Sequence, residues 1–129
     1  MAEKYITTLL LFFMLAESNE LSAKRGDYYR FFPNMNNPET LASKCTQEEI
    51  KNLSNYFIAY RNKYKQVEKI EHLKGDALVD LFRYTYKRTV LTKIIWLKYQ
   101  DTISDRCEID FTETHRHTQC FYKSGALYT

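Results

Sequence analysis

The segment from Leu81 to Tyr99 combines strong apolarity with a purely basic charge, and it constrains the fold more than any other part of the chain. Its basic residues are Arg83, Lys87, Arg88, Lys93 and Lys98, and it contains no Asp, Glu, Gly or Pro. At about 100° per residue, the apolar side chains from Val79 onward form two arcs. Because a helix with two apolar arcs lies between two others, we expect a central helix here.

Few residues that form turns are present, which favours long helices over many short strands. The 129 residues contain only three Gly and two Pro, and 44% of the chain is hydrophobic. The sequence predicts a mostly α single domain, a bundle of three long helices with a short strand-containing tail. The expected elements are a first helix at 1–25, an aromatic loop with a short helix at 26–45, a second helix at 46–74, a third helix at 76–103, and a tail with possible short strands at 104–129.

The expected second helix has a clear start signal. Thr46 and Glu49 have the spacing of a capping box, in which each side chain binds the other residue's backbone amide. The apolar residues that follow have helical spacing: Ile50, Leu53, Phe57, Tyr60, Tyr64 and Val67. This stripe predicts a face that packs on a neighbouring helix, and a homodimer is one way to cover it.

Local signals also mark the two irregular regions. Asn37 and Pro38 favour the start of a short helix, with Pro at its first position. The alternation of apolar and polar residues from Cys107 to Thr112 predicts a half-buried strand. Asp76 follows Gly75 and is expected to cap the third helix.

The apolar run from Ile6 to Ala16 has two interpretations. It is too short to span a membrane, which takes about 20 residues. Its length suits either a buried first helix in a cytoplasmic protein or the core of a secretory signal that is cleaved after Ser18. We favour the buried helix and a cytoplasmic protein, with secretion as the alternative.

Three cysteines cannot form a complete set of internal disulfides. One bridge with a free thiol is allowed, but we expect three reduced thiols in a cytosol. Cys107 and Cys120, with His115 and His117, could supply four zinc ligands, but their spacing matches no standard zinc module. We therefore assign no metal and no cofactor.

Enzymatic activity is not expected. Cys120, a neighbouring histidine and Asp110 could form a nucleophile, a base and an orienting group, but no supporting motif accompanies them. Asp76 and Asp80 are one helical turn apart, yet a cap and an ion pair explain them better. No phosphate-binding loop or dinucleotide fingerprint is present.

The predicted function is that of a small regulatory or inhibitory protein that contacts another protein. Tyr and Arg side chains are favoured at such contacts. The expected contact residues are Arg61, Lys65, Lys69, Arg83, Lys87, Tyr28, Tyr29 and Phe31. The alternative partner is nucleic acid, bound at its phosphates by the five basic residues of this set.

Overall fold

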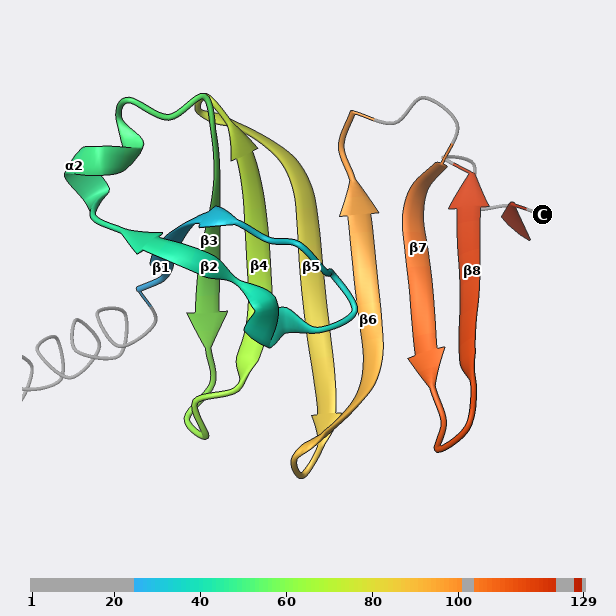
Figure 1. Ribbon diagram of the computed structural model, residues 1–129. Helices are drawn as coiled ribbons and strands as arrows, with labels where there is room; N and C mark the ends of the chain where they lie inside the picture. Colours follow the sequence, from blue (N-terminus) through green and yellow to red (C-terminus); the bar gives the residue numbers. More distant parts are fainter. Residues whose placement is uncertain (1–24, 101–103, 123–126, 129) are drawn as a thin grey trace, which may run out of the picture.

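The computed structural model describes residues 25–100, 104–122 and 127–128, and this part of the chain is almost entirely β-sheet (Figure 1). Its strands are β1 (Asp27–Phe31), β2 (Ala42–Cys45), β3 (Asn55–Arg61), β4 (Val67–Lys74), β5 (Ala77–Lys87), β6 (Val90–Lys98), β7 (Ser104–Phe111), β8 (Arg116–Tyr122) and β9 (Leu127–Tyr128). The described helices are both short: η1 (Pro38–Thr40), a 3-10 helix, and α2 (Gln47–Ile50).

All nine described strands belong to one antiparallel sheet in the order β2-β1-β3-β4-β5-β6-β7-β8-β9. From β3 onward each strand pairs with the next one along the chain. Neighbouring strands therefore run in opposite directions, and the turns that follow β3, β5 and β7 lie at the same end of the sheet, the lower end in Figure 1.

One face of the sheet carries the hydrophobic core and is called the core face here. Its buried residues are Ala59, Val67, Ile70, Phe82, Tyr84, Ile94 and Ile109. Residues 32–41 cross this face between β1 and β2 (Figure 1), and Phe32 packs edge-on against Phe57 and Phe82. The Tyr84 hydroxyl donates a hydrogen bond to the Met35 carbonyl at 2.9 Å, which fixes this crossing segment to the sheet.

The other face, called the opposite face, mixes apolar and charged side chains. Successive strands place Tyr60, Lys69, Arg83, Ile95 and Glu108 in one row across it. Val79 and Leu81 of β5 are also buried, at 4% and 7% exposure. Strand β5 therefore has buried residues on both of its faces.

The predicted helical bundle is wrong. Residues 46–74 form one helical turn and then β3 and β4, and residues 76–103 contain β5 and β6. These segments place apolar residues on both faces of the sheet. The apolar residues on the two sides of β5 therefore gave the pattern expected of a helix that is buried on two sides. The first helix expected at 1–25 lies outside the described residues, apart from Arg25, which precedes β1.

The scarcity of glycine misled the prediction because other residues take the left-handed backbone conformation at turns. Lys65 and Arg88, at the β3–β4 and β5–β6 turns, have φ values of 65° and 61°, and Ser43 within β2 has a φ of 58°. Glycine normally fills such positions without steric cost. Only Gly75, with φ 61°, gives the β4–β5 turn its usual signal, and Asp76 belongs to that turn and caps no helix.

Three local expectations are confirmed. Thr46 and Glu49 form the capping box at the start of α2, with both reciprocal hydrogen bonds present. Asn37 caps η1, which has Pro38 in its first turn. The alternating segment in the tail is β7, whose buried Cys107 and Ile109 lie on the core face.

The stability of the sheet should depend on core-face burial. Val67→Ala removes two methyl groups from a residue with 0% exposure, and we expect a loss of about 2 kcal/mol in unfolding free energy. Val90→Ala is the matched control because Val90 is 64% exposed, and it should change stability by less than about 0.5 kcal/mol. If chemical denaturation gave equal losses of unfolding free energy for the two variants, the assignment of the core face would be contradicted.

Candidate binding surface

Two hairpin turns at the lower end of the sheet form a shared surface (Figure 1). The β3–β4 turn spans 62–66 and the β5–β6 turn spans 88–89. The Gln66 side-chain amide donates a hydrogen bond to the Arg88 carbonyl at 2.6 Å. This bond connects turns that are 22 residues apart in the chain.

The β3–β4 turn is organised by one asparagine. The Asn62 side-chain oxygen accepts hydrogen bonds from the backbone amides of Tyr64 and Gln66, at 2.9 and 3.0 Å. Its side-chain amide also donates to the Gln66 side-chain oxygen at 2.9 Å. Asparagine commonly stabilises turns in this way, and here it directs the side chains of 63–65 outward, where they are exposed.

A hollow of about 770 Å³ lies between the two turns. Its lining residues are mostly polar and aromatic: Asn62, Tyr64, Gln66, Glu68, Tyr84, Thr85, Tyr86, Arg88 and Thr89. Burial raises the pKa of Tyr86 to about 12 and raises that of Tyr84 further. Both phenols are thus neutral at physiological pH, and Tyr86 donates its proton to the Val67 carbonyl at 2.8 Å.

Four exposed cations lie in or next to the two turns, and one of them, Arg88, lines the hollow. We call them, together with two exposed apolar residues, the basic turn end: Lys63, Lys65, Lys87, Arg88, Tyr64 and Val90. None of the four cations forms an ion pair with another described residue. Tyr64 is 71% exposed and lies under the Lys63 ammonium, 5.1 Å from its ring centre. The basic turn end therefore combines exposed positive charge with an exposed aromatic ring.

Arg61 is close to the basic turn end but is already paired. Its guanidinium binds Glu39 at 3.1 Å and donates to the Lys65 carbonyl at 2.6 Å. The hydrogen bond from Arg61 to Glu39 raises the pKa of the guanidinium. Arg61 thus holds the turn to the crossing segment and offers less to a partner than sequence reasoning assigned to it.

Lys69 and Arg83 lie on the opposite face, within β4 and β5. The Lys69 ammonium is 4.3 Å from the centre of the Tyr60 ring, and Arg83 is the neighbour of Lys69 on β5. Burial and a hydrogen bond with Glu71 raise the pKa of Tyr60. A second hollow of about 440 Å³ includes these three side chains, so the opposite face is a smaller candidate surface.

The aromatic residues expected at a contact do not share a surface. Tyr28 lies on the opposite face near Tyr56, with 6.4 Å between ring centres. Tyr29 packs against the core, and Phe31, at the end of β1, is 58% exposed. Of the eight expected contact residues, only Lys65 and Lys87 belong to the basic turn end.

A polar network that the sequence did not suggest lies on the core face. Asp80 accepts hydrogen bonds from the Trp96 indole at 2.9 Å and lies 2.7 Å from the His72 ring nitrogen Nδ1. The other His72 ring nitrogen contacts the side-chain oxygen of Asn55. Phe57 stacks on His72 with 4.5 Å between ring centres. Both carboxylate oxygens of Asp80 and both ring nitrogens of His72 have partners, so we read the network as structural.

The proposed zinc and nucleophile sets are not assembled. Cys107 and Cys120 are cross-strand neighbours joined by a disulfide, so neither is a thiolate ligand or a nucleophile. His117 pairs with Asp110 and lies on the face away from the disulfide, because residues three apart on a strand point in opposite directions. The expectation of three reduced cysteines is also wrong, although Cys45 is free and buried.

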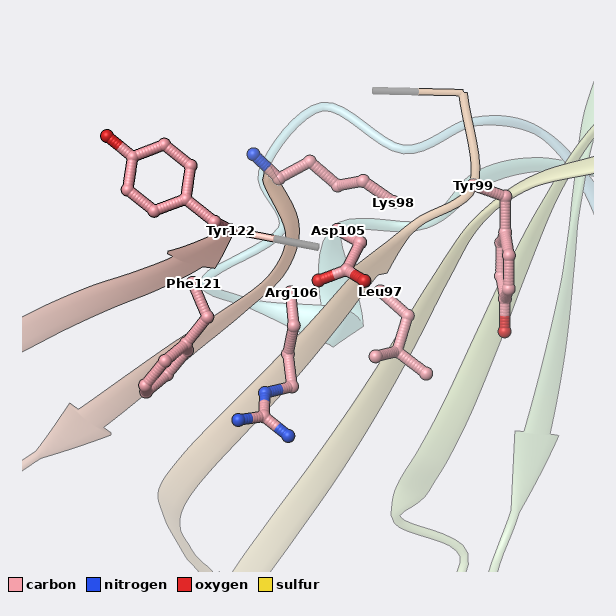
Figure 2. Close-up of a pocket in the computed structure, with 7 residues that line it drawn as sticks. All are labelled: Leu97, Lys98, Tyr99, Asp105, Arg106, Phe121 and Tyr122. Atoms are coloured by element: carbon pink, nitrogen blue, oxygen red, sulfur yellow. The ribbon is translucent and has the colours of Figure 1, made fainter. Parts of the chain in front are cut away.

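A third hollow, of about 360 Å³, lies over β6, β7 and β8 near the upper end of the sheet (Figure 2). In Figure 2, Leu97, Arg106 and Phe121 extend to the same side, and the Arg106 guanidinium is 4.5 Å from the centre of the Phe121 ring. Asp105 and Lys98 also line the hollow. Side chains of both signs give no preference for a ligand of one charge.

Comparisons with protein families, with characterised proteins and with solved structures found no match to this chain. Within the described ranges, no helix is long and apolar enough to cross a membrane. Functional inference therefore depends on the geometry and charge of the surfaces described above.

The Asp80 network should make stability depend on acid. Burial acts to raise the pKa of Asp80, but hydrogen bonds from His72 and Trp96 outweigh it and lower the pKa. Asp80 therefore stabilises the fold fully above its unfolded pKa of about 3.9, and this contribution is lost as pH falls through the lower folded value. Asp80→Asn should cost about 2 kcal/mol at pH 7 and progressively less below pH 4.

Denaturant titrations across this pH range measure the effect. Asp27→Asn is the control, because its ion pair with Lys44 is exposed at 3.5 Å and should contribute little at any pH. A cost of Asp80→Asn that stays constant down to pH 2 would show that the carboxylate charge is unimportant.

Proposed function

We propose that this protein is a non-enzymatic binding protein that contacts an acidic partner protein through the basic turn end. The observation that carries the proposal is the group of four exposed cations that form no ion pair with another described residue, beside an exposed tyrosine and a tyrosine-lined hollow. Charge complementarity speeds encounter and selects the partner. Tyrosines in a hollow supply the anchoring contacts typical of protein interfaces.

The hollow has a size suited to one or two partner side chains. Ligand sites commonly measure 300–1,000 Å³, and this hollow measures about 770 Å³. Thr85 and Thr89 line it beside the tyrosines, and Glu68 is its acidic residue. In a matching partner segment, carboxylates would pair with the cations of the basic turn end, and an aromatic or apolar residue between them would enter the tyrosine-lined hollow.

Nucleic acid remains the alternative, since the same cations could bind phosphates and Tyr64 could stack on a base. The cations are gathered at two turns at the end of the sheet beside a tyrosine-lined hollow, an arrangement that suits a protein side chain as the ligand. The homodimer suggested by the apolar stripe from Ile50 to Val67 stays a prediction.

Binding to a random copolymer of glutamate and tyrosine tests the proposal. Lys65→Glu and Lys87→Glu should each weaken binding about fivefold, since one exposed charge contact contributes ~1 kcal/mol in water. Tyr64→Ala should weaken it by a similar factor. Fluorescence polarisation with a labelled copolymer, at low and moderate salt, measures these changes.

Lys74→Glu is the matched control. Lys74 is exposed at the far end of β4, roughly 25 Å along the eight-residue strand. This distance exceeds the screening length of about 8 Å at physiological salt, so binding should be unchanged. If Lys74→Glu weakened binding of the copolymer as much as Lys65→Glu and Lys87→Glu do, binding would depend only on the net charge of the protein. Tighter binding to a mixed-sequence oligonucleotide than to the copolymer would favour nucleic acid.

We further propose that the protein acts in an oxidising compartment, as a secreted protein. Support comes from the Cys107–Cys120 disulfide, in which Cys107 is 1% exposed. Such bonds persist in secreted proteins and are rare in the cytosol. The apolar run from Ile6 to Ala16 is compatible with this alternative to the cytoplasmic location that we expected.

Alkylation of the protein from its native host tests this location. Under denaturing conditions without reductant, only Cys45 should react, and the other two cysteines should react after reduction. A Cys107→Ser, Cys120→Ser double variant should lose about 3 kcal/mol of stability, because the bond closes a loop of 13 residues. Reaction of all three cysteines without reductant would contradict the proposal.

A further inference from the structure

One asparagine in the chain has the sequence context of a glycosylation acceptor. Asn52, Leu53 and Ser54 form the triplet Asn-x-Ser, and the other six asparagines of the sequence lack a Ser or Thr two residues later. The triplet lies between α2 and β3, in a turn at the upper end of the sheet (Figure 1).

The turn exposes the two residues that a glycosyltransferase must reach. Asn52 and Ser54 are exposed, whereas Leu53 between them is half-buried. Backbone hydrogen bonds from Asn52 to Glu49 and from Leu53 to Ile50, at 3.3 and 3.0 Å, shape the turn.

The Asn52 side chain is also unoccupied, unlike that of several other asparagines. The side-chain oxygens of Asn34, Asn37 and Asn62 accept hydrogen bonds from backbone amides. The Asn52 carboxamide has no hydrogen bond within the described part of the chain. Its nitrogen is therefore available without the loss of a structural contact.

We propose that Asn52 carries an N-linked glycan. The side-chain nitrogen Nδ2 forms a bond to the anomeric C1 of an oligosaccharide supplied by a lipid-linked diphosphate donor. The C1–O bond to the diphosphate breaks, the lipid diphosphate leaves with the electron pair, and the amide nitrogen loses one proton. Ser54 supplies the hydroxyl that completes the acceptor triplet.

This inference rests on the proposed secretion, because the donor and its transferase act in the secretory pathway, where disulfides also form. It does not depend on the binding role of the basic turn end. Strand β3 is seven residues long and separates Asn52 from that end by roughly 20 Å. A glycan at the upper end would shield α2 and leave the lower end open to a partner.

Expression of the full chain in eukaryotic cells, with and without an added secretory signal, tests the site. Intact mass and gel mobility are compared before and after peptide N-glycosidase, which removes the glycan and converts the asparagine to aspartate. The wild-type protein should carry one glycan. Asn52→Gln and Ser54→Ala should abolish it, while Ser54→Thr and Asn62→Gln should retain it.

Formation of the Cys107–Cys120 disulfide in the same sample reports entry into the secretory pathway. A disulfide-bonded protein without a glycan would overturn the Asn52 proposal and leave secretion intact. A glycan that persists in Asn52→Gln would also overturn it. Protein that is glycosylated only with the added signal would support Asn52 as an acceptor and count against secretion by the chain's own signal.

Discussion

The structure depends on burial of β5 on both of its faces. Phe82 and Tyr84 lie on the core face beneath the crossing segment, while Val79 and Leu81 are buried on the opposite face. A strand near the middle of a sheet gains from apolar side chains in both directions, because neither face is fully solvated. Strands β4 and β6 pair along most of its length, which fixes the register of the sheet.

That register decides where the exposed charges lie. The β3–β4 and β5–β6 turns must lie at one end, because the strands that they join run antiparallel. Lys65 and Arg88 take left-handed conformations at these turns, and a glutamine side chain links the turns. Cations that are far apart in the sequence thus become neighbours, which is why this end differs from the rest of the surface.

Most local signals in the sequence were reliable, except the cap expected at Asp76, whereas long-range patterns were not. The capping box at Thr46 and the alternation in β7 depend on nearby residues, and both are present. The apolar stripe from Ile50 to Val67 matched helical spacing, yet the structure divides it between α2, β3, β4 and the segments that connect them. The spacing of apolar residues alone does not distinguish a helical stripe from strands that have apolar residues on both faces. At two turns the left-handed positions are filled by Lys65 and Arg88, so no glycine in the sequence indicated where these strands end.

The same limit applies to the candidate surface. Sequence reasoning identified Lys65 and Lys87 but grouped them with Lys69 and Arg83, which the sheet places on its opposite face. Only the pairing of the strands shows that the side chains of the two turns are close together. The most direct measurement is an NMR titration of the ¹⁵N-labelled protein with the glutamate–tyrosine copolymer. We expect amide shift changes at 62–66 and 86–90, and none at 51–54. Changes confined to other parts of the sheet, or none at all, would contradict the assignment of the basic turn end as the binding surface.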